Sequence, residues 1–326
     1  MTRSAHRILV PSHMLDHLKA RVSERFDVVY ADRIDGISDE EAASLDGFAG
    51  WGRIDRKLID RMANLKIIAS YGVGYDTIDA AYAAEKGIVV THTPDVLSEE
   101  VADVTIGLLL NTLRELPRAE AYLREGRWAK EGPFHLSPLT LRGRHVGIYG
   151  LGRIGLEIAK RLEGFGVEIS YHARSQKTGV RYGYAPTLKV LAEAVDTLVI
   201  AVPGGPETEK SVDAEILKAL GAKGVVINIG RGSVIDEDAL IEALQNRTIA
   251  TAGLDVFAHE PNVPDALLAL PNVSVLPHIA SGSVATRNAM ADLVADNLIA
   301  WFDEGRALTP VPECAEIAAR ASEKND

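Results

Sequence analysis

Four polar residues in the last third of the chain could perform chemistry together. Arg231 follows the apolar run "VVINIG", Asp255 and Glu260 follow "ATAGL", and His278 follows "VSVLP". Such short runs rich in Val and Ile are typical of buried strands in a parallel sheet, and the carboxyl ends of those strands meet at one edge, where ligands bind. We therefore expect an arginine, carboxylates and an imidazole to converge at this edge.

These residue types suit the reduction of a 2-keto acid. That reaction needs an anchor for the carboxylate, a proton donor at the carbonyl oxygen and a hydride. Arg231 can bind a carboxylate through two parallel hydrogen bonds and polarise the carbonyl. His278 can be the general acid, and a hydrogen bond to Glu260 would favour its imidazolium form. Since the reverse reaction needs a neutral histidine, oxidation should have a higher pH optimum than reduction.

Each of these residues also has a purely structural interpretation. Arg231 could only hold the "GRG" turn, His278 could bond to the backbone, and Glu260 could be solvated, as lone glutamates usually are. His259 competes with Glu260 for a role, although neighbouring side chains usually point apart.

The stretch "GIYGLGRIG" carries Gly150, Gly152 and Gly155 in a GxGxxG pattern. The pattern is specific here because it follows a predicted strand, 146–149, and opens a helix near Arg153. The first glycine permits a tight turn, the second lets the backbone approach a pyrophosphate, and the third lets the helix pack closely on the strand. Phosphates would face the helix N-terminus. A glycine-rich turn without a ligand is the alternative.

The next predicted strand ends in "SYHARSQK", where an NAD-binding protein usually has an acid. Arg174, Ser175 and Lys177 instead suit the 2′-phosphate of NADP, so NADP(H) should be preferred over NAD(H). The alternative is that these charges are merely solvated. His172 lies at the adenosine end and is a poor proton donor to a substrate. Other residues assigned to the cofactor site are Leu151, Arg153, Ile154, Val202 and Ile229.

Strand patterns alternate with helical patterns along the whole chain, which predicts an α/β protein with parallel sheets and helices on both faces. Strands are expected at 6–10, 26–30, 65–70 and 87–92, and then at 144–150, 167–173, 197–203, 224–230, 249–256 and 272–278. The second series is enough for a complete dinucleotide-binding domain.

Two predicted helices connect these series. The first has Ser98 as its expected N-cap, and its segment 101–110 is apolar nearly all round, so it should be buried on more than one side. It would connect domains or lie at a subunit contact. The other helix, 283–305, follows the last strand and should return to the first domain.

Composition limits the function classes. A chain of 326 residues is long enough for two domains, and its net charge of −11 disfavours nucleic acid and anionic membranes as partners. Cys314 is the only cysteine, so no internal disulfide or cysteine metal site is expected, and we predict no metal. The N-terminus lacks the apolar core of a signal peptide, and no apolar run approaches membrane-spanning length, which predicts a cytoplasmic protein.

The chain resembles the D-isomer-specific 2-hydroxyacid dehydrogenase family over nearly its whole length. The motifs that carry the resemblance are "GVGYDTID", "TPDVLSEEVADVTIGLLL", "GLGRIG", "INIGRGSVIDEDAL", "AGLDVFAHEP" and "LPHIASGS". Within the family it is most similar to the NADP-dependent glyoxylate/hydroxypyruvate reductases and the related hydroxyphenylpyruvate reductases. The resemblance implies two Rossmann-like or flavodoxin-like doubly wound parallel-sheet domains separated by a cleft. These are a discontinuous substrate-binding domain, 1–98 with 284–326, and a dinucleotide-binding domain, 99–283.

The resemblance also implies an activity: NADPH-dependent reduction of small 2-keto acids, such as glyoxylate or hydroxypyruvate, to D-2-hydroxy acids. Arg231, Glu260 and His278 would be the catalytic set, and Asp255 would lie near the nicotinamide carboxamide. The backbone amides of Val73 and Gly74 would bind the substrate carboxylate. Family members are typically homodimers through the cofactor domain.

Other functions stay open at this point. A phosphoglycerate dehydrogenase would want extra cations, for which Arg53 is one candidate. A hydroxyphenylpyruvate reductase is another possibility within the family, where selectivity depends on loops such as the one at Trp51. A non-catalytic dinucleotide-sensing protein shares this fold, but the intact arginine, glutamate and histidine set argues against it.

Overall fold

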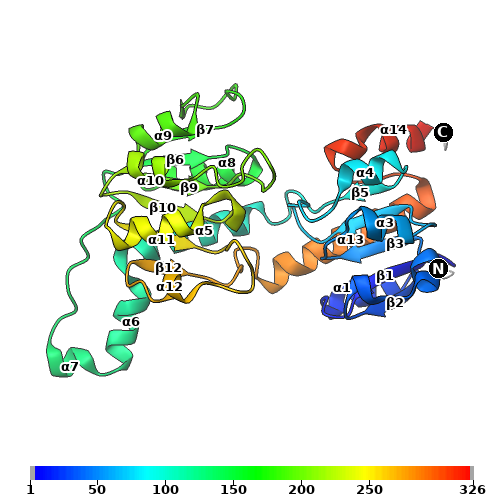
Figure 1. Cartoon of the computed structure of the whole chain (residues 1–326), viewed down its shortest axis with the longest axis horizontal. Coiled ribbons are helices and arrows are strands. Elements are labelled where there is room, and N and C mark those ends of the chain that lie inside the picture. Colours follow the sequence, from blue (N-terminus) through cyan, green and yellow to red (C-terminus); the bar gives the residue numbers. More distant parts are fainter. Residues whose placement is uncertain (1–3, 324–326) are drawn as a thin grey trace. The chain divides into compact units, whose positions relative to one another are not determined.

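The computed structural model describes residues 4–323, which form two compact units (Figure 1). The first unit takes in the chain up to Leu97 and again from Ser283, and the second comprises Ser98–Gly282. The boundaries expected from the sequence, 98/99 and 283/284, lie one residue later than these.

The second unit is built on seven parallel strands in the order β12-β11-β10-β9-β6-β7-β8. The strand order reverses between β6 and β9, which creates a switch point where a ligand can bind beyond the strand ends. The short strand β8 was not predicted. The strands are β6 (His145–Tyr149), β7 (Glu168–His172), β8 (Gly183–Tyr184), β9 (Thr197–Ile200), β10 (Val225–Asn228), β11 (Thr251–Leu254) and β12 (Val273–Val275).

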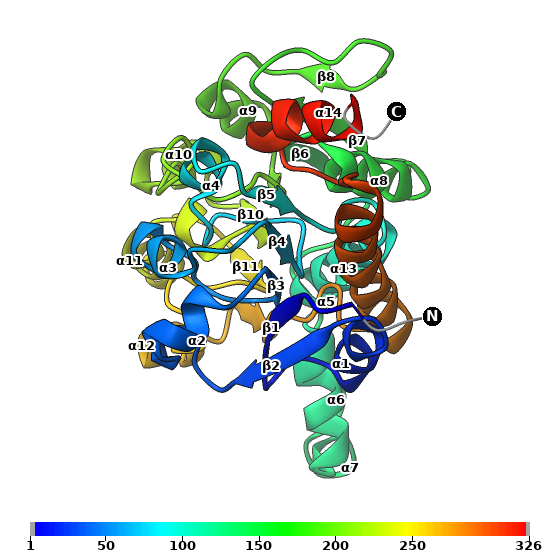
Figure 2. The same ribbon diagram turned by 90° about the vertical axis from the view of Figure 1, so that its right-hand side faces the viewer.

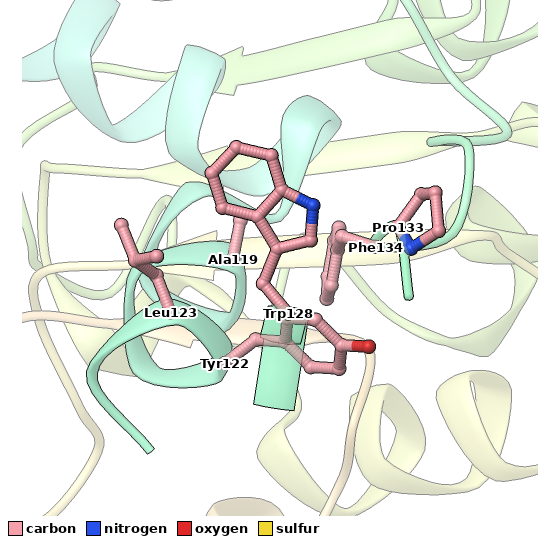
Figure 3. A pocket seen from close by; sticks show the side chains of 6 residues that line it. All are labelled: Ala119, Tyr122, Leu123, Trp128, Pro133 and Phe134. Atoms are coloured by element: carbon pink, nitrogen blue, oxygen red, sulfur yellow. The ribbon is translucent and has the colours of Figure 1, made fainter. Parts of the chain in front are cut away.

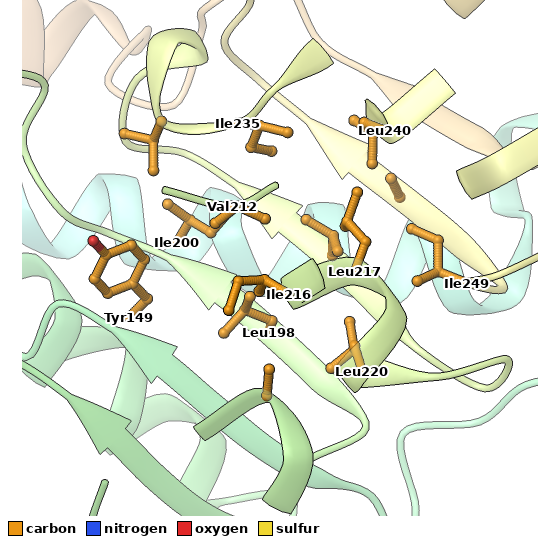
Figure 4. Packing of buried hydrophobic residues seen from close by; sticks show 14 of the residues in the cluster. Tyr149, Leu198, Ile200, Val212, Ile216, Leu217, Leu220, Ile235, Leu240 and Ile249 are labelled. Carbon is orange, nitrogen blue, oxygen red and sulfur yellow. The ribbon is translucent and has the colours of Figure 1, made fainter. Parts of the chain in front are cut away.

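Helices cover both faces of this sheet. On one face, apolar side chains from β9, β10 and β11 and from the helices α9, α10 and α11 form a continuous core (Figure 4). On the other face α5 packs on α8 and on β10, β11 and β12. The helices are α5 (Ser98–Arg114), α6 (Leu116–Arg124), α7 (Arg127–Glu131), α8 (Arg153–Glu163), α9 (Leu188–Ala194), α10 (Ala214–Leu220), α11 (Glu237–Gln245) and α12 (Asp265–Leu268), with a 3₁₀ turn η2 (Gly232–Val234).

Helix α5 is buried on several sides, as its apolar composition predicts. Gly253 in β11 lets it lie close to the sheet, because a Cβ there would stand 2.4 Å from Thr112 Oγ1 and 3.0 Å from Leu108 Cγ. The prediction that Ser98 caps α5 was wrong. Ser98 already lies inside the helix, and its buried Oγ makes no hydrogen bond within the described residues.

The first unit has five parallel strands in the order β2-β1-β3-β4-β5. The central strand β3 was missed, because "GFAG" has two glycines and no β-branched residue. Gly47 is required by packing, since a Cβ there would lie 2.8 Å from Ile8 Cδ1. The strands are β1 (Arg7–Pro11), β2 (Asp27–Ala31), β3 (Gly47–Gly50), β4 (Ile67–Ser70) and β5 (Val89–Thr91).

The helix that follows the second unit, α13, packs on β3, β4 and α1, as expected for a segment that returns to the first domain. Figure 2 shows α1 and α13 on one face of the five-stranded sheet and α2, α3 and α4 on the other. No helix in the described part of the chain is long and apolar enough to cross a membrane. The helices are α1 (Asp16–Ser23), α2 (Asp39–Ala43), α3 (Arg56–Arg61), α4 (Ala80–Glu85), α13 (Val284–Glu304) and α14 (Ala315–Glu323), with 3₁₀ turns η1 (Ile34–Gly36) and η3 (Pro312–Cys314).

Candidate active site

The glycine loop lies between β6 and α8, at the switch point of the seven-stranded sheet. Gly150 has a positive φ of 101°, and a Cβ there would stand 2.8 Å from Val202 Cγ1. A Cβ on Gly155 would lie 2.1 Å from the carbonyl oxygen of Gly150, so the helix could not pack here with any larger residue. A Cβ on Gly152 would meet no atom within 4 Å, which leaves open space beside the N-terminus of α8. That space fits the pyrophosphate of a dinucleotide.

The other residues assigned to the cofactor lie around this loop. Val202 follows β9 beside Gly150, and its carbonyl oxygen would be 2.7 Å from a Cβ on Gly230, so the ends of β6, β9 and β10 are in contact. Leu151, Val202 and Ile229 are buried, Ile154 is half-buried and Arg153 is exposed.

The loop after β7 presents its cations to solvent. Arg174, Ser175 and Lys177 are exposed, and neither cation has an ion-pair partner within residues 4–323. By contrast Arg181, a few residues on, pairs with Glu163 at 2.5 Å. The loop is anchored because the Lys177 amide donates a hydrogen bond to Tyr171 Oη at 2.8 Å. Unneutralised cations beside a nucleotide loop fit a 2′-phosphate.

Arg231 lies in the turn after β10, which a buried amide holds in place. Asn228 Nδ2 donates to the carbonyl oxygen of Arg231 at 2.9 Å, and Asn228 Oδ1 accepts from the Gly230 amide at 3.0 Å. A Cβ on Gly232 would lie 1.8 Å from the carbonyl carbon of Phe257, so this turn packs directly on the loop that leads to Glu260. The two loops are therefore brought together by backbone contact.

His278 and Glu260 form a hydrogen-bonded pair. The imidazole Nδ1 is 2.7 Å from Glu260 Oε2, while Glu260 Oε1 accepts from the Phe257 amide at 3.0 Å. The Nε2 atom of His278 has no hydrogen-bond partner within residues 4–323. More than a third of each side chain is exposed, 39% of His278 and 34% of Glu260. The pair therefore leaves one ring nitrogen free to exchange a proton with a substrate.

Asp255 holds the backbone that carries His278. Its carboxylate accepts from the amides of Ile279 and Ala280, each at 2.8 Å, and its carbonyl oxygen accepts from the His278 amide at 2.8 Å. His278 has a φ of 54°, a conformation that non-glycine residues rarely adopt. A strained backbone conformation persists where several surrounding contacts fix it, and such conformations are common at active sites.

The two carboxylates differ in their ionisation. Burial raises the pKa of Asp255, and the bonds from the Ile279 and Ala280 amides offset only part of this. Burial also acts to raise the pKa of Glu260. The hydrogen bonds from His278 and the Phe257 amide, with the positive charges of His278 and Arg231, outweigh it and hold the pKa below its usual range. Glu260 is thus kept ionised beside the imidazole.

The first unit offers backbone groups at the end of β4. The amides of Val73 and Gly74 donate no hydrogen bond within the described residues. The carbonyl of Val73 is bound by His92 Nδ1 at 2.9 Å, and the His92 ring stands edge-on to Tyr75 at 5.7 Å. Two free amides in an anchored loop can bind a carboxylate.

Several other side chains singled out from the sequence lie apart from this chemistry. His259 is exposed next to Glu260 and has no role in the pair. His172 bonds through Nδ1 to the Ala185 carbonyl at 2.9 Å. Arg53 is exposed after β3. Residues 4–323 contain no group of three or more histidine, cysteine or acidic residues that could hold a metal ion.

Sequence reasoning missed Asn228 and His92. Asn228 is 1% exposed within an apolar strand, so an amide in "VVIN" was a signal that the following turn needs support. His92, at the end of "VVTH", had no such signal, because its partner Val73 contributes only a carbonyl.

Comparisons with known proteins agree with this geometry. The family model described as "D-isomer specific 2-hydroxyacid dehydrogenase, NAD binding domain" matches residues 106–280. The chain is 51% identical over 257 residues to a glyoxylate/hydroxypyruvate reductase A of Arabidopsis thaliana, covering 79% of this chain and 82% of the relative. It is 48% identical over 257 residues to a hydroxyphenylpyruvate reductase of Plectranthus scutellarioides, with the same coverage of 79% and 82%.

A solved structure is similar along almost the entire chain. It is the NADPH-dependent glyoxylate/hydroxypyruvate reductase of Sinorhizobium meliloti in complex with NADP and malonate. The identity is 58% and the TM-score 0.93, with 95% of this chain and 98% of that chain covered. The family model spans more than half of the chain, and the relatives cover more than two thirds of it at high identity. The chain therefore belongs to the D-isomer-specific 2-hydroxyacid dehydrogenases.

Proposed function

We propose that this protein is an NADPH-dependent reductase that converts glyoxylate, hydroxypyruvate or a closely related 2-keto acid to the D-2-hydroxy acid. The observation that carries the proposal is the pair of His278 Nδ1 and Glu260 Oε2, 2.7 Å apart, beside a loop that presents Arg231. The relatives from Arabidopsis thaliana and Sinorhizobium meliloti, both named as glyoxylate/hydroxypyruvate reductases, support the same activity.

A bound NADPH would supply the hydride to the carbonyl carbon. Arg231 binds the substrate carboxylate and polarises the carbonyl, because a guanidinium can donate two parallel hydrogen bonds. His278 donates the proton from Nε2 to the carbonyl oxygen, and its Nδ1 stays bonded to Glu260. The ionised Glu260 stabilises the imidazolium before transfer. We assign the amides of Val73 and Gly74 to the substrate carboxylate as well.

NADP(H) is the cofactor that the residues fit. The open space at Gly152 suits the pyrophosphate, and Arg174, Ser175 and Lys177 suit the 2′-phosphate. We place Asp255 near the nicotinamide carboxamide, because it follows β11 at the edge of the sheet and its buried carboxylate holds the Ile279 and Ala280 amides next to His278.

The first test is steady-state kcat/KM for glyoxylate and hydroxypyruvate, each with NADPH and with NADH, and with hydroxyphenylpyruvate as a third substrate. We expect turnover of at least one small acid with a clear preference for NADPH. A preference for NADH would contradict the role of Arg174 and leave the reductase assignment intact. No turnover with either cofactor would contradict the assignment itself.

We propose that the working form is a homodimer built through the arm formed by α6 and α7. The arm extends away from its own sheet (Figure 1), and its helices have nine and five residues, too few to be stable alone. Figure 3 shows Tyr122, Trp128 and Phe134 around an apolar hollow on it. Large apolar side chains are exposed on the arm and on the segment that follows it, and we infer that a second copy of the chain packs against them. These side chains are Leu116, Leu123, Trp128 and Leu136.

The dimer is tested by light scattering after gel filtration. Leu123→Glu with Trp128→Glu should shift the mass from dimer to monomer, whereas Leu15→Glu, an exposed leucine of the first unit, should not. A monomeric wild-type protein would contradict the proposal. We place the protein in the cytoplasm, consistent with a lone, buried and unpaired Cys314.

A further inference from the structure

A second arginine, Arg287, lies close to the loop assigned to the substrate carboxylate and takes no part in the mechanism proposed for Arg231 and His278. It comes from the first turn of α13 in the first unit. Its guanidinium carbon lies 5.0 Å from the ring centre of Trp51 and 6.0 Å from that of Tyr71. Cation–π contacts of this kind hold a guanidinium plane in place without neutralising its charge.

The aromatic rings of Trp51 and Tyr71 connect Arg287 to the Val73–Gly74 loop. Trp51 follows β3 and stands edge-on to Tyr71, with ring centres 5.7 Å apart. The Trp51 indole also covers Gly72, since a Cβ there would lie 3.4 Å from Nε1. Arg287 is therefore connected through Trp51 to Gly72, which directly precedes the Val73–Gly74 loop of the first unit.

The charge of Arg287 is not matched by an acid. It has no ion-pair partner among the described side chains, whereas two acids of the same helix, Asp292 and Asp296, are bound to Arg21 of α1 at 3.0 and 2.8 Å. Burial raises the pKa of Tyr71, and the charge of Arg287 only partly opposes this, so the phenol stays neutral beside the guanidinium.

The backbone of Arg287 is bound at the same place. Its carbonyl oxygen accepts a 2.6 Å hydrogen bond from Tyr71 Oη, which holds the first turn of α13 beside the two rings. Trp51 remains 42% exposed, so the platform faces solvent. A guanidinium held on an exposed aromatic face offers several hydrogen-bond donors in a fixed plane.

We propose that Arg287, held on Trp51, is a specificity-determining residue that binds an oxygen atom at the far end of the substrate, away from the reacting carbonyl. This rests on the proposed function and deepens it. The enzyme then selects 2-keto acids whose side chain carries a hydroxyl or another oxygen acceptor over apolar acids of the same size.

The test uses a matched pair of substrates, hydroxypyruvate and 2-oxobutyrate, which differ by a hydroxyl in place of a methyl group, with glyoxylate as the acid that has no side chain. Steady-state kcat/KM with NADPH is measured for wild type, Arg287→Gln and Arg287→Lys. In Arg287→Gln the ratio of hydroxypyruvate to 2-oxobutyrate should fall by about 10- to 100-fold, the size of one hydrogen bond to a charged group. Glyoxylate should change by less than about 3-fold, because it lacks the bound atom. Arg287→Lys should retain part of the wild-type preference for hydroxypyruvate over 2-oxobutyrate.

Arg56→Gln is the matched control, because Arg56 also lies over a tyrosine, 4.9 Å from the Tyr82 ring, but is paired with Asp79 at 2.8 Å. It should leave the ratio unchanged. If Arg287→Gln does not fold, as judged by circular dichroism, Trp51→Leu removes the platform and should lower the same ratio.

Two results would overturn the role of Arg287 and leave the proposed function intact. One is an unchanged ratio in a folded Arg287→Gln protein. The other is an equal loss of kcat/KM for all three acids, which would mean that Arg287 binds the substrate carboxylate or supports the fold. Absence of wild-type turnover on every acid would overturn the proposed function, and this proposal with it.

Discussion

The two sheets are both parallel and doubly wound, yet the ends of their strands carry different chemistry. In the seven-stranded sheet the loops after β10, β11 and β12 present the charged or titratable side chains of Arg231, Glu260 and His278, and the buried Asp255 holds the backbone after His278. In the five-stranded sheet the loop after β4 presents the backbone amides of Val73 and Gly74 next to aromatic rings. The edge of the seven-stranded sheet therefore offers side chains to a ligand, and the edge of the five-stranded sheet offers main-chain amides.

This difference has a physical consequence for mutation. Side-chain chemistry is removed by a single substitution, whereas main-chain chemistry changes only when a neighbour that holds the loop is altered. Substitutions at the side chains after β10, β11 and β12 should therefore affect the rate of the chemical step. Those at the cofactor loop after β7 and at the five-stranded sheet should affect binding. Four substitutions test this contrast, from the largest expected effect to the smallest.

Replacing His278 by alanine should lower kcat for glyoxylate reduction by about 10²- to 10⁴-fold, the usual contribution of a positioned general acid. His259→Ala is the matched control, because His259 is exposed and unpaired with Glu260. It should stay within about 3-fold of wild type, well below the effect of losing an acid catalyst. Equal losses in both variants would refute the assignment of the proton donor.

Replacing Glu260 by glutamine should lower kcat by about 10- to 100-fold, because a hydrogen bond to a charged group is lost. The pH–rate profile should also lose the change that the wild type shows at low pH, because a glutamine cannot ionise. In wild type the pKa of Glu260 is depressed, so its contribution is complete above its ordinary pKa of about 4.3 and is lost as the pH falls through the folded-state value. A pH–rate profile that is identical in both proteins would contradict the pairing.

Replacing Arg174 by alanine should raise KM for NADPH by about 10- to 100-fold and leave KM for NADH nearly unchanged, because only NADPH carries the 2′-phosphate. Arg181→Ala removes another exposed arginine, which is already paired with Glu163, and should change neither constant. If both variants lost NADPH affinity alike, the effect would be general electrostatic attraction.

Replacing His92 by phenylalanine should raise KM for the keto acid by about 2- to 10-fold with little change in kcat, because one neutral hydrogen bond to the Val73 carbonyl is lost. His92→Asn can place an amide donor at the position of Nδ1 and should recover most of the affinity. A fall in kcat with unchanged KM would mean that the Val73 loop does not bind the substrate.

Much of the second unit could be predicted because its signals are local. The strand, turn and helix around Gly150, Gly152 and Gly155 lie within consecutive residues, and Gly155 meets a steric requirement from the turn itself, the approach of the Gly150 carbonyl oxygen. The first unit was harder to predict. Strand β3 has no β-branched residue, and its Gly47 is explained only by the approach of Ile8 from a neighbouring strand.

The sequence by itself determined which residue types were available: an arginine, a carboxylate and a histidine after successive strands, and cations where an acid is expected. Only the tertiary structure decided their partners. Glu260, and not His259, meets His278 because Gly232 packs on the backbone of Phe257 and sets the course of that loop. Arg287 reaches Trp51, far away in sequence, because α13 returns to the five-stranded sheet. Residue type is a local property, whereas the contacts between distant segments depend on how whole elements pack.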